Sequence, residues 1–237
     1  MLYAFHTASN YDGTVNALNG CMNDWRNYLV NIDDHFGVPQ ENRQSYVAKN
    51  YRRELVVAQA KLLPGMIHAG DTLIYSNSSH GTDMPDQDGD EVDGYDEALY
   101  TDDGKFISDD EIHQLMTKFI PGCLVMGFFD NCRAGTMDRN VSLNWHSMPP
   151  DVKCHAVFFF GCVERGTSAD AYINGRYEGA FSHFLFQALF ERKYELTYLE
   201  LLTCTNELLR KNRYRQVGQM ACTPGMENLK FGTMPNV

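Results

Sequence analysis

An alternation of strand-like and helix-like segments is the feature that most constrains the fold of this chain of 237 residues. Leu124–Phe129 and Ala156–Phe160 are unbroken apolar runs, which is typical of parallel strands covered on both faces. Further strands are predicted at Leu2–His6, Gln44–Ala48 and Thr72–Tyr75, and helices at Cys21–Phe36, Arg52–Ile67, Ser108–Phe119, Gly179–Glu191 and Leu196–Lys211. The alternation predicts one α/β domain over residues 1–237, with a mainly parallel central sheet between two helical layers.

Local signals set the ends of three of these helices. Gly37 and Pro39 end the first helix, and Pro64 must kink or end the second because proline removes a backbone donor. Ser108 and Glu111 have the spacing of a capping box, which predicts the start of the third helix at this point.

Composition excludes several classes of protein. The chain has 31 acidic and 20 basic residues, a net charge of −11, which disfavours nonspecific binding to nucleic acid. No apolar run approaches the roughly 20 residues of a membrane span, and Met1–His6 lacks the features of a signal peptide. The seven cysteines include no CxxC pair, so neither a disulfide framework nor a zinc ribbon is expected. Free thiols favour a reducing compartment, and we therefore expect a cytoplasmic location.

The negative charge is concentrated in one segment. Between Asp83 and Glu111 there are 13 acidic residues and one basic residue, whereas the rest of the chain has a net charge of +1. Such a segment requires a cation, a basic partner or plain solvation. Its acids partly match an EF-hand loop, but Glu91 stands where that loop needs glycine, so a true EF-hand is excluded.

Polar residues follow two of the predicted strands. Thr72–Tyr75 leads to His80 and Gly81, and Leu124–Phe129 leads to Cys132. Because the carboxyl ends of parallel strands meet at one edge of a sheet, where active sites collect, we expect His80 and Cys132 to lie at the same edge.

A cysteine beside a histidine is suited to acyl transfer. The Cys132 thiolate would be the nucleophile, and His80 would act first as general base and then as general acid. The backbone N–H groups of Gly81 and Cys132 could form the oxyanion hole. The alternative is a buried structural cysteine and an unrelated surface histidine.

Five motifs follow one another along the chain: Leu18–Asp24, Asp71–Thr82, Asp88–Leu99, Phe129–Thr136, and Gly161–Cys162 together with Thr167–Asp170 and Gly179–Phe181. With these motifs the chain resembles the metacaspases, which are cysteine peptidases of the caspase fold. The motifs extend over nearly the whole chain, and the resemblance implies a caspase-like three-layer α/β/α sandwich. Two departures, Arg133–Ala134 after the cysteine and Asn77–Ser79 before the histidine, leave the pair intact but alter its surroundings.

The resemblance also implies cleavage after Arg or Lys. The matching pocket residues are Asp24 and Asp130, with Ser78 as a weaker third member. A carboxylate pair can hold a guanidinium group through directional, charge-assisted hydrogen bonds. The alternative is structural: Asp24 would cap its helix and Asp130 would hold the loop that carries Cys132.

A calcium site is the third feature that the resemblance implies. The matching ligands are Asp93, Asp109, Asp110 and Asp138, and hard oxygen ligands of this kind suit Ca²⁺. The alternatives are complementarity to a helix dipole for Asp109 and Asp110, and a solvated loop for the others.

Two rival functions remain open from the sequence. One is a noncatalytic caspase-fold module that binds basic peptides or protein partners, and the other is a related paracaspase-like or legumain-like peptidase. The presence of both His80 and Cys132 favours catalysis. The resemblance further implies a monomer that acts on protein or peptide substrates with basic residues. From the composition, we expect binding neither to nucleic acid nor to a membrane.

Overall fold

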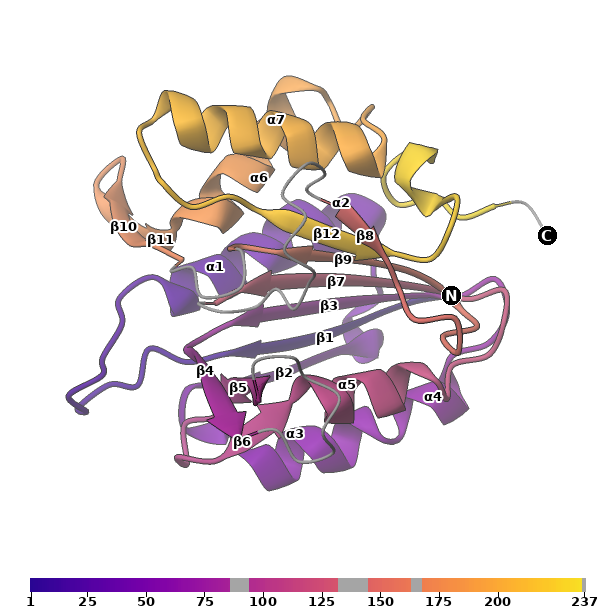
Figure 1. Cartoon of the computed structure of the whole chain (residues 1–237), viewed down its shortest axis with the longest axis horizontal. Coiled ribbons are helices and arrows are strands. Elements are labelled where there is room, and N and C mark those ends of the chain that lie inside the picture. Colours follow the sequence, from indigo (N-terminus) through magenta and orange to yellow (C-terminus); the bar gives the residue numbers. More distant parts are fainter. Residues whose placement is uncertain (86–93, 132–144, 163–167, 236–237) are drawn as a thin grey trace.

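The computed structural model describes residues 1–85, 94–131, 145–162 and 168–235. A seven-stranded sheet forms its centre, with the strand order β2-β1-β3-β7-β9-β12-β8 (Figure 1). These strands are β1 (Leu2–Ala8), β2 (Arg43–Val47), β3 (Thr72–Ser78), β7 (Leu124–Asp130), β8 (Trp145–Ser147), β9 (His155–Phe160) and β12 (Gln219–Cys222). The first five strands in this order are parallel, whereas β12 runs antiparallel to β9.

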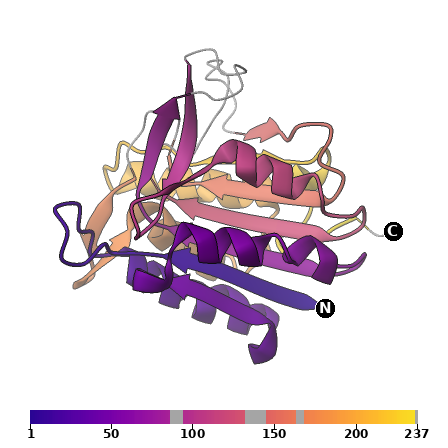
Figure 2. The ribbon, with the colours of Figure 1, turned by 90° about the horizontal axis from the view of Figure 1, so that it is seen from below.

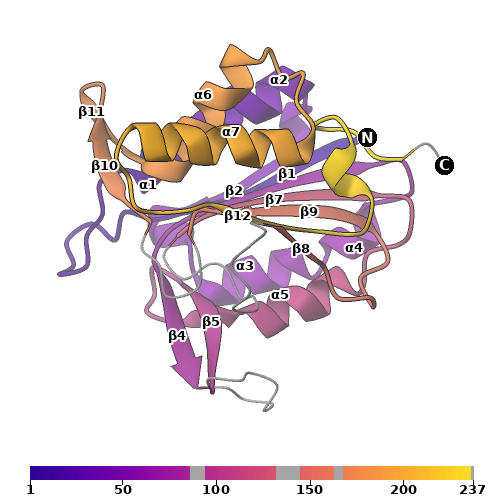
Figure 3. The ribbon, with the colours of Figure 1, turned by 45° about the horizontal axis from the view of Figure 1, so that its top comes forward.

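Helices cover both faces of the sheet (Figures 1 and 3). One face carries α1 (Cys21–Tyr28), α2 (Asp34–Phe36), α6 (Ala180–Glu191) and α7 (Tyr198–Lys211), and the other carries α3 (Arg53–Ala60), α4 (Leu63–Met66) and α5 (Asp109–Met116). A π-helical turn, η1 (Leu29–Asp33), joins α1 to α2, and short 3-10 helices lie at η2 (Gln40–Asn42), η3 (Ala48–Asn50) and η4 (Met226–Asn228). The expected three-layer α/β architecture with a mainly parallel central sheet is therefore confirmed.

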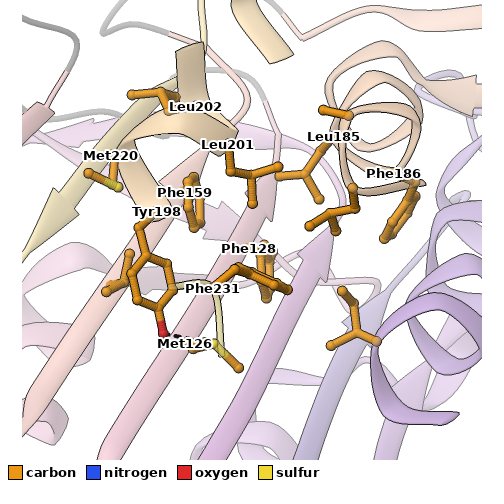
Figure 4. Close-up of a cluster of buried hydrophobic side chains, with 14 of the residues drawn as sticks. Met126, Phe128, Phe159, Leu185, Phe186, Tyr198, Leu201, Leu202, Met220 and Phe231 are labelled. Atoms are coloured by element: carbon orange, nitrogen blue, oxygen red, sulfur yellow. Dashed lines mark hydrogen bonds between the residues drawn. The ribbon is translucent and has the colours of Figure 1, made fainter. Parts of the chain in front are cut away.

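Each face of the sheet has its own hydrophobic core. Successive side chains of a strand point to opposite faces, so Met126 and Phe128 of β7 face α6 and α7 while Val125 and Phe129 face α3 and α5. Figure 4 shows the first core, where side chains from the sheet, α6, α7 and the C-terminal segment interdigitate. Burial on both faces explains why β7 is an unbroken apolar run in the sequence.

Two smaller antiparallel units flank the carboxyl edge of the sheet. One contains β4 (Gly81–Pro85), β5 (Tyr95–Tyr100) and β6 (Phe106–Ser108), and the other is the hairpin of β10 (Asp170–Ile173) and β11 (Arg176–Gly179). Figure 2 shows β4 and β5 projecting away from the main sheet. The sequence analysis did not predict these short strands, because no alternation of apolar and polar residues indicates them.

Several predicted boundaries require correction. Strand β3 extends beyond Tyr75 through Ser78, because its polar end pairs with β1 and β7. The second predicted helix ends at Ala60, and Pro64 lies in the first turn of α4, where the missing N–H costs nothing. Gly37, with φ of 73°, ends α2 in the left-handed conformation as predicted. In the described part of the chain, no helix has the length and apolar character needed to cross a membrane.

Candidate active site

The candidate site lies at the carboxyl edge of β3 and β7. In the parallel pairing of these strands, Ser78 of β3 is opposite Asp130 of β7. His80 comes two residues after Ser78, and Cys132 comes two residues after Asp130 in the sequence. Cys132 lies outside the described residues, so its predicted proximity to His80 is untested.

His80 is held by the loop between β1 and α1. Its Nε2 lies 2.6 Å from the carbonyl oxygen of Asn16, and the ring packs against Tyr11 with 4.8 Å between centroids. The His80 backbone N–H donates to the Tyr11 hydroxyl at 3.2 Å. Because a carbonyl oxygen only accepts, Nε2 carries the proton and Nδ1 of the neutral ring is the basic nitrogen.

Asp24 and Asp130 form a buried pair of carboxylates. Asp24, from α1, is 1% exposed and accepts hydrogen bonds from Ser78 Oγ at 2.7 Å and from the Gly179 N–H at 3.0 Å. Asp130 is 5% exposed and accepts from the Ser182 N–H at 2.9 Å and from the Ser168 hydroxyl. The structure therefore brings together the three predicted pocket residues, Asp24, Asp130 and Ser78.

The environment of this pair raises both carboxyl pKa values. Burial raises the pKa of Asp24 well above its ordinary value, and the nearby Asp130 raises it further. Burial likewise raises the pKa of Asp130, against the hydrogen bonds from Ser168 and Ser182, which lower it. Among the residues that the structure describes, no cationic side chain pairs with Asp24 or Asp130, which is the condition expected of a site that receives a positive group.

A pocket of about 70 Å³ opens between these groups. Asp24, Ser78, His80 and Asp130 line it, and so do Leu18, Cys21, Ser79, Asn131, Ser168, Ala169, Asp170 and Gly179. The candidate general base and the acid pair therefore share one cavity. Cys21 is 6% exposed, and burial raises its thiol pKa well above the ordinary value, which makes it unsuited to act as the nucleophile.

Asp170 is a third carboxylate of the pocket that the sequence interpretation missed. Its Oδ2 accepts from the Asn19 backbone N–H at 2.8 Å, whereas its buried Oδ1 has no hydrogen-bond partner among the described residues. Asp170 belongs to one of the five family-like motifs, so the signal was present, but the sequence alone did not show that it lines the same cavity as Asp24.

Gly179 is required because the two carboxylates converge on it. A Cβ at this position would overlap Asp130 Oδ2 and would lie 2.9 Å from Asp24 Oδ2. No side chain fits here without displacing the acid pair.

If the chain has the peptidase activity that the sequence predicts, Gly179→Ala is expected to lower its kcat/KM for an Arg-containing peptide by about 100-fold, since small displacements of positioning groups cost this much. Steady-state kinetics check the result. Gly65→Ala is the control, because a Cβ at Gly65 meets no atom within 4 Å. Equal activity of the two variants would show that the acid pair does not need its present geometry.

Of the predicted calcium ligands, only Asp109 and Asp110 belong to the described residues; Asp93 and Asp138 do not. Asp109 and Asp110 open α5 directly after its N-cap, Ser108, and both are half-buried. Their hard oxygen donors fit Ca²⁺ chemically. Among the described residues, no three His, Cys, Asp or Glu side chains form a metal-binding group, so the four-ligand set stays a prediction.

Comparisons with known proteins agree with this fold. The family model for the metacaspase peptidase C14 domain matches residues 4–139, and the chain belongs to that family. Metacaspase-1 of Schizosaccharomyces pombe is 27% identical over 90% of this chain, and metacaspase-1 of Yarrowia lipolytica is 29% identical over 94%. The alignments span 65% and 62% of those two proteins.

Solved structures support the fold. Protein GSU0716 from Geobacter sulfurreducens superposes with a TM-score of 0.76 at 22% identity and covers 99% of both chains. Caspase-1 from Spodoptera frugiperda superposes with a TM-score of 0.64 at 14% identity, covering 98% of this chain and 92% of that one. The predicted resemblance to metacaspases is confirmed by the family model and by these metacaspase-1 relatives.

Proposed function

We propose that this chain is a cysteine endopeptidase that cleaves peptide bonds after Arg or Lys. The observation that carries the proposal is the buried acid pair, Asp24 and Asp130, which shares a pocket with the imidazole of His80. A guanidinium or ammonium group entering this pocket would offset the repulsion between the carboxylates, and the guanidinium fork suits them best. Within the described part of the chain the Oδ1 atom of Asp170 has no hydrogen-bond partner, so it would offer a further acceptor to the same cation.

In the proposed reaction, Nδ1 of His80 takes the thiol proton of Cys132, and the thiolate attacks the carbonyl carbon of the scissile bond. The backbone N–H groups of Gly81 and Cys132 would stabilise the oxyanion. His80 then returns the proton to the leaving amine, and a thioester remains. Water, deprotonated by the same imidazole, hydrolyses the thioester and releases the thiol.

The contacts of His80 support its role as the base. The Asn16 carbonyl fixes the tautomer, and Tyr11 packs against the ring, so Nδ1 needs little reorganisation before proton transfer. The strand register supports Cys132 as the partner, since Ser78 and Asp130 are paired and both reactive residues come two positions later.

A matched set of fluorogenic peptides tests this function. We expect turnover when Arg precedes the cleaved bond, weaker turnover with Lys, and none with Asp. Citrulline has the shape of Arg without its charge. Replacing the Arg of the peptide by citrulline is expected to lower kcat/KM by at least about 100-fold. Equal turnover of the Arg and citrulline peptides would refute the role of the acid pair. Binding of the Arg peptide without turnover would instead identify the noncatalytic module.

We further propose that Ca²⁺ stimulates the activity through Asp93, Asp109, Asp110 and Asp138. The donors are all carboxylates, and the segment that contains three of them is the most acidic in the chain. A bound Ca²⁺ ion supplies positive charge that offsets the mutual repulsion of these groups. The side chains of Asp109 and Asp110 would hold the ion at the start of α5, close in sequence to β6.

Asp109→Asn together with Asp110→Asn is expected to abolish stimulation by millimolar Ca²⁺, because half of the proposed ligands lose their charge. Turnover of the Arg peptide in EGTA and in Ca²⁺ measures the effect. The control is Asp102→Asn with Asp103→Asn, which changes the same charge outside the ligand set. Equal wild-type turnover in EGTA and in Ca²⁺ would contradict the proposal.

We also propose a cytoplasmic location, because all six cysteines in the described residues are free thiols. We propose a monomer that acts on protein or peptide substrates with basic residues, on the resemblance to metacaspases alone.

A further inference from the structure

A second cavity lies between α3 and α5, on the face of the central sheet that these two helices cover. Its volume is about 130 Å³, close to that of an engineered apolar cavity of about 150 Å³ that holds benzene. Phe5, Tyr75, Phe129 and Phe158 of the sheet form an aromatic floor. We call this cavity the α3–α5 slot, and Figure 2 shows the two helices on the near face of the sheet.

The walls of the slot are apolar and partly open to solvent. Val57 and Ala60 of α3 face Ile112 and Leu115 of α5, and all four side chains are only half-buried although they belong to the edge of a core. Apolar surface left in this state is stabilised when an apolar ligand covers it.

An ion pair closes one end of the slot. Arg53, the first residue of α3, donates from Nη2 to Glu111 Oε1 at 2.6 Å and from Nε to the Phe106 carbonyl at 2.7 Å. Both partners of the pair belong to the first turns of their helices. The carboxylate of Glu111 is therefore already neutralised and does not repel an anion elsewhere in the slot.

The other end carries two lysines. Lys61 follows the last residue of α3 and Lys118 follows the last turn of α5, and both line the slot. The two helices are parallel to each other because each leads into a parallel strand, β3 or β7, so these lysines lie at the same end. Within residues 1–85, 94–131, 145–162 and 168–235, neither ammonium group has an ion-pair partner.

We propose that the α3–α5 slot binds a small apolar carboxylate, with an alkyl or aryl body of about six to eight carbons in the slot. The body lies over the aromatic floor, and the carboxylate lies between Lys61 and Lys118. The apolar walls select the body, and the unpaired ammonium groups select the charge of the head group. This site is separate from the pocket of His80 and does not depend on the proposed peptidase activity.

Ligand titrations of the whole chain with octanoate and octanol, followed by NMR, test the charge requirement. We expect octanoate to bind roughly tenfold more tightly than octanol, and Lys61→Glu or Lys118→Glu to weaken octanoate about two- to fivefold each without affecting octanol. The two lysines also complement the helix dipoles, and octanol separates that role from ligand binding. Lys211→Glu on the opposite helical layer is the control and should change nothing.

A slot-filling variant tests the location. Ala60→Leu extends a half-buried wall residue into the cavity, and it should abolish binding of both ligands while the melting temperature stays the same or rises. The proposal is overturned if octanol binds as tightly as octanoate, if the lysine variants leave octanoate binding unchanged, or if folded Ala60→Leu still binds octanoate. Absence of octanoate binding to the wild type also overturns it.

Discussion

Asp24→Asn is expected to lower kcat/KM for an Arg-containing peptide by about 100- to 1,000-fold. The reason is that it removes one of the two buried carboxylates proposed to hold the guanidinium group of the substrate. Asp24 is 1% exposed, so water cannot replace the lost carboxylate. The asparagine can still accept from Ser78 and Gly179, and the fold should therefore survive the change. Activity measured with matched Arg and citrulline peptides should show that the discrimination between them collapses.

The same variant is expected to be more stable than the wild type at neutral pH, because it removes a buried carboxylate whose charged form is disfavoured. The folded-state pKa of Asp24 is raised, so the folded protein binds its proton more tightly than the unfolded chain does. Proton binding by Asp24 therefore stabilises the wild type in full below the pKa that Asp24 has in the unfolded chain. This stabilisation is lost as the pH rises through the pKa of Asp24 in the folded protein. The stability advantage of Asp24→Asn should therefore grow with pH over this window in thermal unfolding experiments.

Asp34→Asn is the matched control, since Asp34 is a half-exposed acid in α2 that pairs with Arg43 on the surface. It should leave both kcat/KM and the pH dependence of stability unchanged within a small factor. Full activity of Asp24→Asn toward the Arg peptide would show that the pocket does not recognise the basic side chain.

Cys132→Ala is expected to lower turnover of the Arg peptide by at least about 1,000-fold, because it removes the proposed nucleophile. Cys21 lines the pocket but its thiol pKa is raised well above the ordinary value by burial, and Cys162 is also fully buried. Binding of the peptide should persist, since the acid pair is untouched. The control is Cys204→Ala in α7, which should keep wild-type kinetics. Residual turnover near the wild-type rate would assign the chemistry to another residue.

Much of the fold could be predicted because the pattern of burial is simple. Strands β7 and β9 are covered on both faces, and their sequences are therefore unbroken apolar runs. The capping box at Ser108 has the predicted reciprocal hydrogen bonds. The short strands β10 and β11 could not be predicted, because their stability comes from packing against α1 and α6 rather than from an alternating pattern.

The pocket could be predicted only through the family resemblance. Nothing in composition or periodicity shows that Asp24 of α1 and Asp130 of β7 meet, since 106 positions separate them and only the folded chain joins them. His6 is a second example: it is buried within a strand, with Nε2 2.9 Å from Asp33 Oδ2 and Nδ1 2.7 Å from Ser76 Oγ. A polar network of this kind leaves no local trace in the sequence.

Covalent labelling with an Arg-containing peptidyl chloromethyl ketone, followed by peptide mapping, tests the central claim most directly. Alkylation by such a reagent requires an activated thiolate beside a pocket for Arg. The account predicts one label per chain, on Cys132, with labelling strongly slowed in His80→Ala and in Asp24→Asn. Labelling spread over several thiols, or equally fast labelling without His80, would contradict it.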